Sequence, residues 1–332
     1  MMKSVFRISM FILLIFLNNF CKKDKPILPI LSTSNVRAIG HLTAISGGNT
    51  ANWLEAKILS DGVCWSRSEM PTISDNKTLD GTTNSNFKSL LTGLSGNTIY
   101  YVRAYATKSV GTGYGEQIQF TTADDYTGQT GKVYDVDGNV YKTIGIGSQI
   151  WFTENLKTTG LNNAAPIQNV TSDSLWYYSV TPAYCWYDND STNKSIYGAL
   201  YNWLTVNTGY LCPSGWHIPD QDEWYILIDD LGGSSVAGGK LKEIGTTHWV
   251  SPNLDATNET NFTALPGGSR TDEGQFNGIG GVGLWWSSTV YPTLGQGREA
   301  GYIHIGADLG IVPVETTGFI WQGFSARCVK NH

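Results

Sequence analysis

The distribution of hydrophobic and polar positions divides the chain into three parts. An unbroken apolar run covers residues 8–17, short alternating segments continue to about residue 122, and the remainder mixes alternation with helical spacing. In "TIYYVRAYA" two groups of residues alternate along the chain, and the group with the smaller side chains suits a protein core. This alternation predicts a strand with one buried face. The buried set is Tyr100, Val102, Ala104 and Ala106.

Turn signals separate the short strands of the region 31–122 at regular spacing. They are "ISGGN", "LSDG", "LDGTTN", "GLSGN" and "SVGTGYG". Strands of this length and spacing predict a β-sandwich domain over residues 31–122. The polar, glycine-containing stretch 123–130 indicates a linker, and a second domain then covers residues 131–332.

Two helices are expected in the second domain. In "SIYGALYNWL" the apolar residues recur at helical spacing, which predicts a helix over residues 195–204. In "DQDEWYILIDDLGG" Asp220 and Glu223 have the spacing of a capping box, and Gly232-Gly233 follows the last apolar position. The apolar stripe of this second helix is Trp224, Leu227, Ile228 and Leu231.

A β-hairpin is predicted around Asp137-Gly138, because valines and tyrosines flank this pair. Asp135, Asp137 and Asn139 also match the start of a helix-loop-helix calcium loop. The twelfth position of that loop is Ile146 rather than glutamate, and the flanks are strands, so the turn is favoured.

Composition and charge exclude one class of partner. The chain has 28 acidic residues against 22 Lys and Arg, a net charge of -6, so the phosphate attraction that drives nucleic-acid binding is missing. The many glycines, tyrosines and tryptophans are typical of β-rich extracellular modules.

The N-terminus predicts export. Lys3 and Arg7 flank the start of the apolar run, which is too short to span a membrane but suits a signal peptide over residues 1–20. The following "CKKDKPILP" resembles the start of a mature bacterial lipoprotein, which implies lipidation of Cys21, a tether over 21–30 and attachment to a membrane through the lipid. The expected location is the bacterial outer membrane or cell surface, and the alternatives to lipidation are an ordinary secreted protein and an uncleaved anchor.

Residues 31–122 resemble a fibronectin type III domain of the kind found in bacterial surface proteins. The resemblance rests on "LTGLSGNTIYYVRAYATKSVGTGYGEQIQFTT", with Tyr100 at the place of the corner tyrosine, and on "DGVCWS" followed by "PTIS". Cys64 in this context is expected to be a buried, unpaired thiol.

The second domain resembles the Fibrobacter succinogenes major paralogous domain. The motifs that carry the resemblance are "IGSQIWFTENL", "YCWYDND", "YGALYNW", "CPSGWHIPDQDEW", "GGKLKEIG", "FTALPGGSR", "GIGGVGLWWSST" and "SARCVKN". That family occurs in secreted and surface lipoproteins, and the resemblance implies no particular activity.

A more distant resemblance concerns architecture. "GWHIPDQDEW" and "ARCVK" are similar to pieces of formylglycine-generating enzymes and C-type lectin-like domains, where the first and last parts of the domain lie side by side. This implies an α+β fold with two main helices and a disulfide between Cys212 and Cys328, with two buried thiols as the alternative. Cys185 is then left as a small buried residue.

Catalytic motifs are missing from the sequence. It contains no G-x-S-x-G and no H-E-x-x-H, and Cys328 alone lies where formylglycine-generating enzymes carry two redox cysteines. "GIGGVG" precedes an expected strand, which favours a tight loop over a dinucleotide site. His217 sits among packing and capping residues, which favours a structural role.

Two function classes remain open. The favoured one is a non-catalytic binding or adhesion module for glycan or protein ligands, and an extracellular enzyme with an unrecognised site is the alternative. Asp188, Asn189 and Asp190 are the candidate calcium ligands, although an Asx-rich turn is the favoured interpretation. The candidate ligand-contacting aromatics are Trp285, Trp286 and Trp321, although for each one taken individually a place in the core is favoured.

Overall fold

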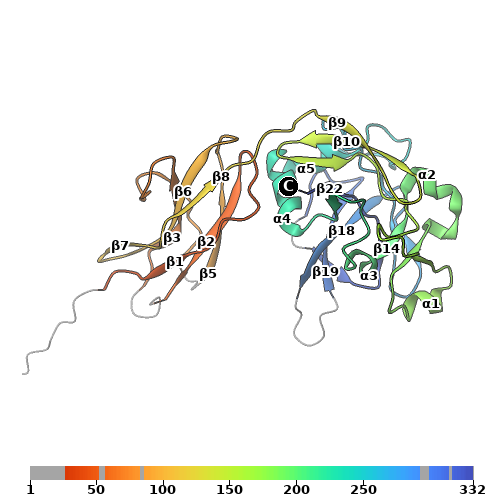
Figure 1. The fold of residues 1–332 in the computed structure, drawn as a ribbon, viewed down its shortest axis with the longest axis horizontal. Coiled ribbons are helices and arrows are strands. Elements are labelled where there is room, and N and C mark those ends of the chain that lie inside the picture. The colour runs from red at the N-terminus through yellow and green to blue at the C-terminus, as the bar shows by residue number, and fades with distance from the viewer. Residues whose placement is uncertain (1–26, 52–56, 83–85, 292–298, 314–315, 332) are drawn as a thin grey trace, which may run out of the picture.

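The computed structural model describes residues 27–51, 57–82, 86–291, 299–313 and 316–331. Figure 1 shows two bodies, a smaller one formed by the N-terminal strands and a larger one formed by the rest of the chain. The expected signal peptide, Cys21 and most of the tether lie outside the described residues. Within the described ranges, no helix has both the length and the apolar character needed to cross a bilayer.

The N-terminal domain consists of two sheets with a core between them. One sheet has the strand order β1-β2-β5, and the other has the order β4-β3-β6-β7 with β8 also paired to β6. The core side chains come from both sheets, so the β-rich expectation is confirmed. The strands are β1 (Leu31–Thr33), β2 (Ala44–Thr50), β3 (Ser60–Ser66), β4 (Asn76–Lys77), β5 (Asn86–Leu91), β6 (Ile99–Lys108), β7 (Gly111–Tyr114) and β8 (Ile118–Thr121).

Tyr100 and Cys64 lie in this core as expected. The Tyr100 hydroxyl accepts hydrogen bonds from the Ser95 backbone N–H at 3.2 Å and from Arg67 Nε at 3.4 Å. Cys64 is fully buried and unpaired, and burial raises the pKa of its thiol to about 11. A thiol with that pKa is not a nucleophile at neutral pH.

The C-terminal domain contains three further sheets. Their strand orders are β15-β22-β11-β10-β9, β12-β13-β14-β21-β16-β17 and β18-β19-β20. The strands are β9 (Thr130–Tyr134), β10 (Val140–Ile146), β11 (Gln149–Phe152), β12 (Gln168–Asn169), β13 (Ala183–Cys185), β14 (Leu200–Asn202), β15 (Trp216–His217), β16 (Ser269–Arg270), β17 (Phe276–Asn277), β18 (Val282–Tyr291), β19 (Glu299–Gly306), β20 (Thr316–Phe319), β21 (Gly323–Phe324) and β22 (Val329–Lys330).

The helices of this domain are short. They are α1 (Asp173–Tyr177), α2 (Lys194–Tyr197), α3 (Trp203–Val206), α4 (Gln221–Asp230) and α5 (Ser234–Leu241), with 3-10 turns at Tyr187–Asn189 and Ser191–Asn193. The α4 prediction is confirmed. Asp220 accepts from Glu223 N while Glu223 accepts from Asp220 N, and the predicted stripe of α4 is buried.

The prediction of a helix over residues 195–204 is wrong. The segment forms α2, then Gly198, then the strand β14, then α3. Gly198 adopts φ 75° and packs so closely on residue 156 that a Cβ would lie 2.5 Å from the Leu156 carbonyl oxygen. β14 pairs with β13 and β21, so sheet formation overrides the local helical spacing.

The helix α5 is missing from the sequence prediction because its segment, "SSVAGGKL", contains two glycines that disfavour a helix in isolation. The helix is held by close packing instead. A Cβ on Gly239 would lie 2.3 Å from the Asp255 carbonyl oxygen, so the backbone of this helix directly touches the segment it covers.

Three clusters of buried hydrophobic residues lie in the described part of this domain, and adjacent residues on one strand enter two different clusters. Successive side chains of a strand point to opposite faces. Trp285 therefore packs in the core around Trp151 and Trp224, while Trp286 packs in the core around Phe152 and Phe324. Both side chains are fully buried, which confirms the favoured place in the core for each and corrects the candidate ligand contact.

Both indole N–H groups are satisfied inside the domain. Trp285 Nε1 donates to Asn155 Oδ1 at 2.8 Å, and Trp286 Nε1 donates to the Tyr201 carbonyl at 2.7 Å. Trp321 is half-buried, and ligand contact there stays a prediction.

The disulfide between Cys212 and Cys328 is confirmed, with Cα atoms 6.0 Å apart. It joins the segment before β15 to the segment before β22, and these two strands also pair with each other. The segments 212–217 and 328–330 therefore lie side by side. Cys185 is buried and unpaired, as expected.

The two domains contact each other through α4. Asp222 pairs with Arg37 and lies 3.5 Å from Lys88 Nζ, and Asp230 Oδ2 lies 3.5 Å from His41 Nδ1. The linker adds backbone hydrogen bonds to both sides, from residue 123 to the N-terminal domain and from residue 126 to the C-terminal domain. The linker thus has fixed hydrogen-bond partners and places the two domains against one another (Figure 1).

Candidate functional site

The candidate calcium residues form a turn on the surface. Asp190 Oδ1 accepts from Thr192 N at 2.9 Å, and this hydrogen bond lowers the pKa of Asp190. Asn189 Nδ2 donates to the Thr171 carbonyl at 3.0 Å. In the described part of the chain, no three His, Cys, Asp or Glu side chains are grouped so that they could hold a metal ion. The Asx turn accounts for these contacts, and calcium binding stays a prediction.

The acids at the start of α4 lie beside a groove of about 570 Å³ between the domains. Asp220, Asp222, Glu223 and Arg37 contribute to its lining. Each acid has a structural partner: Asp220 and Glu223 cap the helix, and Asp222 pairs with Arg37. Burial raises the pKa of Asp220. These carboxylates hold the helix and the domain interface, and no pair of them is free for acid-base work.

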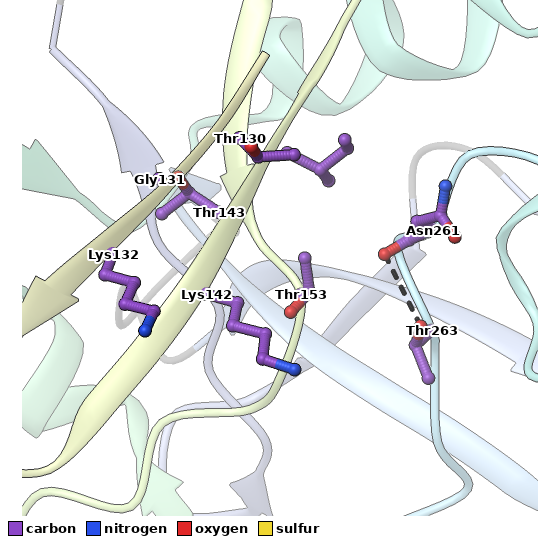
Figure 2. Close-up of a pocket in the computed structure, with 9 residues that line it drawn as sticks. Thr130, Gly131, Lys132, Lys142, Thr143, Thr153, Asn261 and Thr263 are labelled. Atoms are coloured by element: carbon purple, nitrogen blue, oxygen red, sulfur yellow. Dashed lines mark hydrogen bonds between the residues drawn. The ribbon is translucent and has the colours of Figure 1, made fainter. Parts of the chain in front are cut away.

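A second cavity has a different lining. It has a volume of about 570 Å³ and lies between β9, β10 and Thr153, which directly follows β11, on one side and the loop 258–263 on the other. Figure 2 shows the side chains of Lys132 and Lys142 extending from neighbouring strands toward the same side, with Asn261 and Thr263 on the facing loop. The lining residues are Thr130, Gly131, Lys132, Lys142, Thr143, Ile144, Thr153, Asn261 and Thr263.

The hairpin predicted around Asp137-Gly138 builds one wall of this cavity. Asp135 Oδ1 accepts from the backbone N–H groups of Asp137 and Asn139, which fixes the turn, and the register then places Lys142 directly opposite Lys132. The Lys142 carbonyl accepts from Thr153 N, on the side of β11. The pair with Lys132 is therefore of the non-hydrogen-bonded type, in which facing side chains lie closest.

The two ammonium groups of this wall have no carboxylate within ion-pair distance among the described residues. Glu154, next to Thr153 in the chain, pairs with Lys157 at 2.6 Å instead. Both Lys132 and Lys142 are exposed. The wall therefore presents two positive charges that nothing in the described chain neutralises by direct contact.

The facing loop is held in an unusual backbone conformation. Asn258, Asn261 and Thr263 have φ values of 48°, 56° and 55°. For a β-branched residue such as Thr263 a positive φ is an outlier, and outliers of this kind concentrate at functional sites. Asn258 stabilises the loop by accepting from Thr263 N at 2.9 Å and donating to Thr263 Oγ1 at 3.1 Å.

The buried Arg327 holds the same loop through hydrogen bonds to its backbone. Arg327 is fully buried and donates to the carbonyls of Phe262 and Thr263 and to Asn155 Oδ1. Burial lowers the pKa of this guanidinium to about 9, and the nearby Glu154 charge opposes that shift. Phe262 itself packs on Trp151 in the core. These contacts hold Asn261 and Thr263, the two chain neighbours of Phe262, at the cavity.

The sequence predicted the hairpin that builds one wall of this cavity, but not the cavity. The pairing of Lys132 with Lys142 depends on the register, and the observed turn, with Asp135 opposite Asn139, sets that register. The facing loop was not predictable, because it comes from a segment more than a hundred residues away.

The α1 region carries a separate group of exposed apolar side chains. Tyr178 is 75% exposed and Val180 is 82% exposed, and Tyr177 packs against Tyr178 with ring centres 4.9 Å apart. This region lies on the side of the C-terminal domain that faces away from the N-terminal domain (Figure 1). It is a second surface suited to contact with other molecules.

Comparison with known proteins gives one family and several distant structures. The family model described as the Fibrobacter succinogenes major domain matches residues 144–330, more than half of the chain. A search of curated proteins found no match. One similar solved structure is the sensor domain of the anti-sigma factor RsgI4 from Pseudobacteroides cellulosolvens, at 8% identity over 29% of this chain and 75% of that one, with a TM-score of 0.22.

A second similar structure is a fibronectin type III domain from the human KIAA0970 protein. It is 13% identical over 28% of this chain and 72% of that chain, with a TM-score of 0.21. Similarities of this size carry no argument about the function of the present chain.

Proposed function

The chain belongs to the Fibrobacter succinogenes major domain family, and we propose that it is an exported module that binds a glycan or protein ligand without transforming it. The observation that supports this proposal is the chemistry of the cavity between β9–β11 and the loop 258–263. Its lining offers hydroxyl, amide and ammonium groups, and none of its described lining residues carries a carboxylate or an imidazole. Such a lining holds a polar ligand but supplies no general acid-base pair at neutral pH.

The alternative function, an extracellular enzyme, would draw on the acids of the interdomain groove. Glu223 is the one acid there in contact with a histidine, His217, and the same carboxylate caps α4. Because a general base needs a free lone pair facing a substrate, this arrangement favours binding over catalysis.

The architecture that we propose is a fibronectin type III-like sandwich followed by a C-type lectin-like α+β domain. The contact of Tyr100 with the backbone of Ser95 supports the first assignment. The pairing of β15 with β22, together with the Cys212–Cys328 bond, supports the second. In this arrangement the sandwich is a spacer between the membrane and the binding domain.

Attachment through a lipid on Cys21 is part of the same proposal, with the outer membrane or cell surface as the location. The test is globomycin-sensitive processing in the producing bacterium. A peptide that begins at Cys21 should carry the mass of acyl chains, and Cys21→Ala should abolish both signals. Normal processing in the presence of globomycin would contradict lipidation.

The binding function is tested on glycan and protein arrays with the mature chain, with hydrolase and oxidase panels run in parallel. Thr153→Trp fills the cavity, and Thr247→Trp places the same bulky residue on an exposed loop elsewhere as a matched control. We expect array binding that Thr153→Trp abolishes and Thr247→Trp preserves. Turnover of a panel substrate without array binding would refute the proposal, and so would array binding that Thr153→Trp does not weaken.

A further inference from the structure

We infer that the ligand of this cavity is an acidic saccharide, whose carboxylate or sulfate group sits between Lys132 and Lys142. The inference rests on the proposed binding function and deepens it by naming the class of ligand. It starts from the register of the β9–β10 hairpin, which places the two lysines directly opposite each other.

Two like charges on directly opposite strand positions are unfavourable. Here they form a non-hydrogen-bonded pair, the closer of the two pair types, and neither ammonium group has a carboxylate within ion-pair distance in the part of the chain that the structure describes. An anion placed between the two groups converts the repulsion into two charge-assisted hydrogen bonds. A bound anionic group should therefore stabilise this arrangement of the two lysines.

The rest of the lining suits the remainder of a sugar. Thr153 lies beside Lys142, and Asn261 and Thr263 lie across the cavity, so hydroxyl and amide groups surround the cationic pair (Figure 2). Ile144 adds one apolar surface. A volume of about 570 Å³ lies within the range of small-molecule sites and is far larger than a bare sulfate or carboxylate needs.

The facing wall is rigid enough to select such a ligand. Arg327 holds the carbonyls of Phe262 and Thr263, and Asn258 holds both the backbone and the hydroxyl of Thr263. Side chains on a fixed loop lose little freedom on binding, which favours affinity. A nucleic acid is a poor alternative, because the chain has a net charge of -6 and this site contributes only two cations.

The test compares charged and neutral forms of the same sugar. The probes are trigalacturonate with its methyl ester, and a heparin tetrasaccharide with its desulfated, N-acetylated form, with sodium sulfate alone as a further arm. Binding to the mature chain is measured by calorimetry at low and at high salt. We expect one charged member to bind about tenfold or more tightly than its neutral partner, with a difference that shrinks at high salt.

The variants are Lys132→Gln, Lys142→Gln and the double variant, with Lys57→Gln on the N-terminal domain as the control for the change in net charge. The double variant should lose the discrimination between charged and neutral sugar, Lys142→Arg should keep it, and Lys57→Gln should leave it unchanged. Without any ligand, Lys142→Gln should raise the Tm, because it removes the facing like charge.

The outcomes separate this inference from the proposed function. Equal binding of charged and neutral sugars, or discrimination that survives the double variant, refutes the anionic subsite and leaves the binding function standing. Array hits with no binding of either acidic probe do the same. If Thr153→Trp does not weaken binding, the cavity is not the binding site, and the proposed function is refuted with it.

Discussion

His217 connects the start of α4 to the last residues of the chain. Its Nε2 lies 2.7 Å from Glu223 Oε2, and its Nδ1 lies 2.7 Å from Asn331 Oδ1. The same Glu223 oxygen accepts from Asp220 N, so one carboxylate serves both the capping box and the histidine. The histidine that stood out in the sequence therefore has a structural role at a helix end.

This pair predicts a pH dependence of stability. Burial lowers the pKa of His217, but the hydrogen bonds and charge of Glu223 outweigh that effect, so the pKa is raised above 6.5. The stabilisation is then fully present below the unfolded pKa and is lost as the pH rises through the folded pKa. His217→Gln should cost up to about 1 kcal/mol at pH 5.5, because the pair is partly exposed, and almost nothing at pH 9. Urea unfolding at both pH values measures the difference.

His304 is the matched comparison for this measurement, because burial lowers the pKa of His304. Its contribution should have the opposite sign, with stability present above the unfolded pKa and lost as the pH falls. The assignment fails if His217→Gln and His304→Gln change stability in the same direction with pH.

Removal of the Cys212–Cys328 disulfide should destabilise the C-terminal domain strongly. The bond closes a loop over a sequence separation of 116 residues, and loss of a native disulfide costs about 2–5 kcal/mol. Cys212→Ala, Cys328→Ala and the double variant should lose similar amounts in thermal unfolding, because each removes the same bond. Dithiothreitol should lower the Tm of the wild type toward that of the variants. An equal effect of dithiothreitol on the double variant would contradict this.

The contact between the domains should depend on Asp222. This residue pairs with Arg37 and lies near Lys88, both on the N-terminal domain. Asp222→Asn removes both attractions, which are worth about 1 kcal/mol or less each because the partners are partly exposed. Small-angle scattering should show a larger radius of gyration for Asp222→Asn than for the wild type at low salt. The wild type in high salt should show the same increase. Glu273→Gln, an exposed acid away from the interface, should match wild type.

Replacement of Asp229 by a neutral side chain should stabilise the folded protein. Burial raises the pKa of Asp229 to about 6, and Lys88 opposes this only in part. A carboxyl group with a raised folded pKa loses stability as the pH rises from the unfolded value through 6. Asp229→Asn should therefore gain about 1 kcal/mol at pH 7.5, after allowance for solvent screening, and nothing at pH 3.5. A gain that is equal at both pH values would show that charge is not the cause.

Local sequence signals determined several elements. The capping spacing of Asp220 and Glu223 and the apolar stripe behind it are present in the folded helix, because an end cap and a helix face are decided within a few residues. The Asp137-Gly138 hairpin follows for the same reason, since a turn and its two strands are contiguous. The family was likewise readable, from ordered motifs along the chain.

Tertiary structure decided what the local signals could not. Residues 195–204 have helical spacing, yet β14 forms there because β13 and β21 offer strand partners from distant segments. Trp285 and Trp286 are ordinary candidates for a binding surface in the sequence, but β18 lies between two cores and buries one in each.

The candidate site shows the same division. The sequence by itself predicted the hairpin around Asp137-Gly138, because a turn and its two strands are contiguous, whereas the observed turn set the register that pairs Lys132 with Lys142. Only the tertiary structure brought the loop 258–263 opposite to them, through Phe262 in the core and the buried Arg327. A cavity between segments far apart in the chain depends on how those segments pack, and no pattern within either segment encodes that packing.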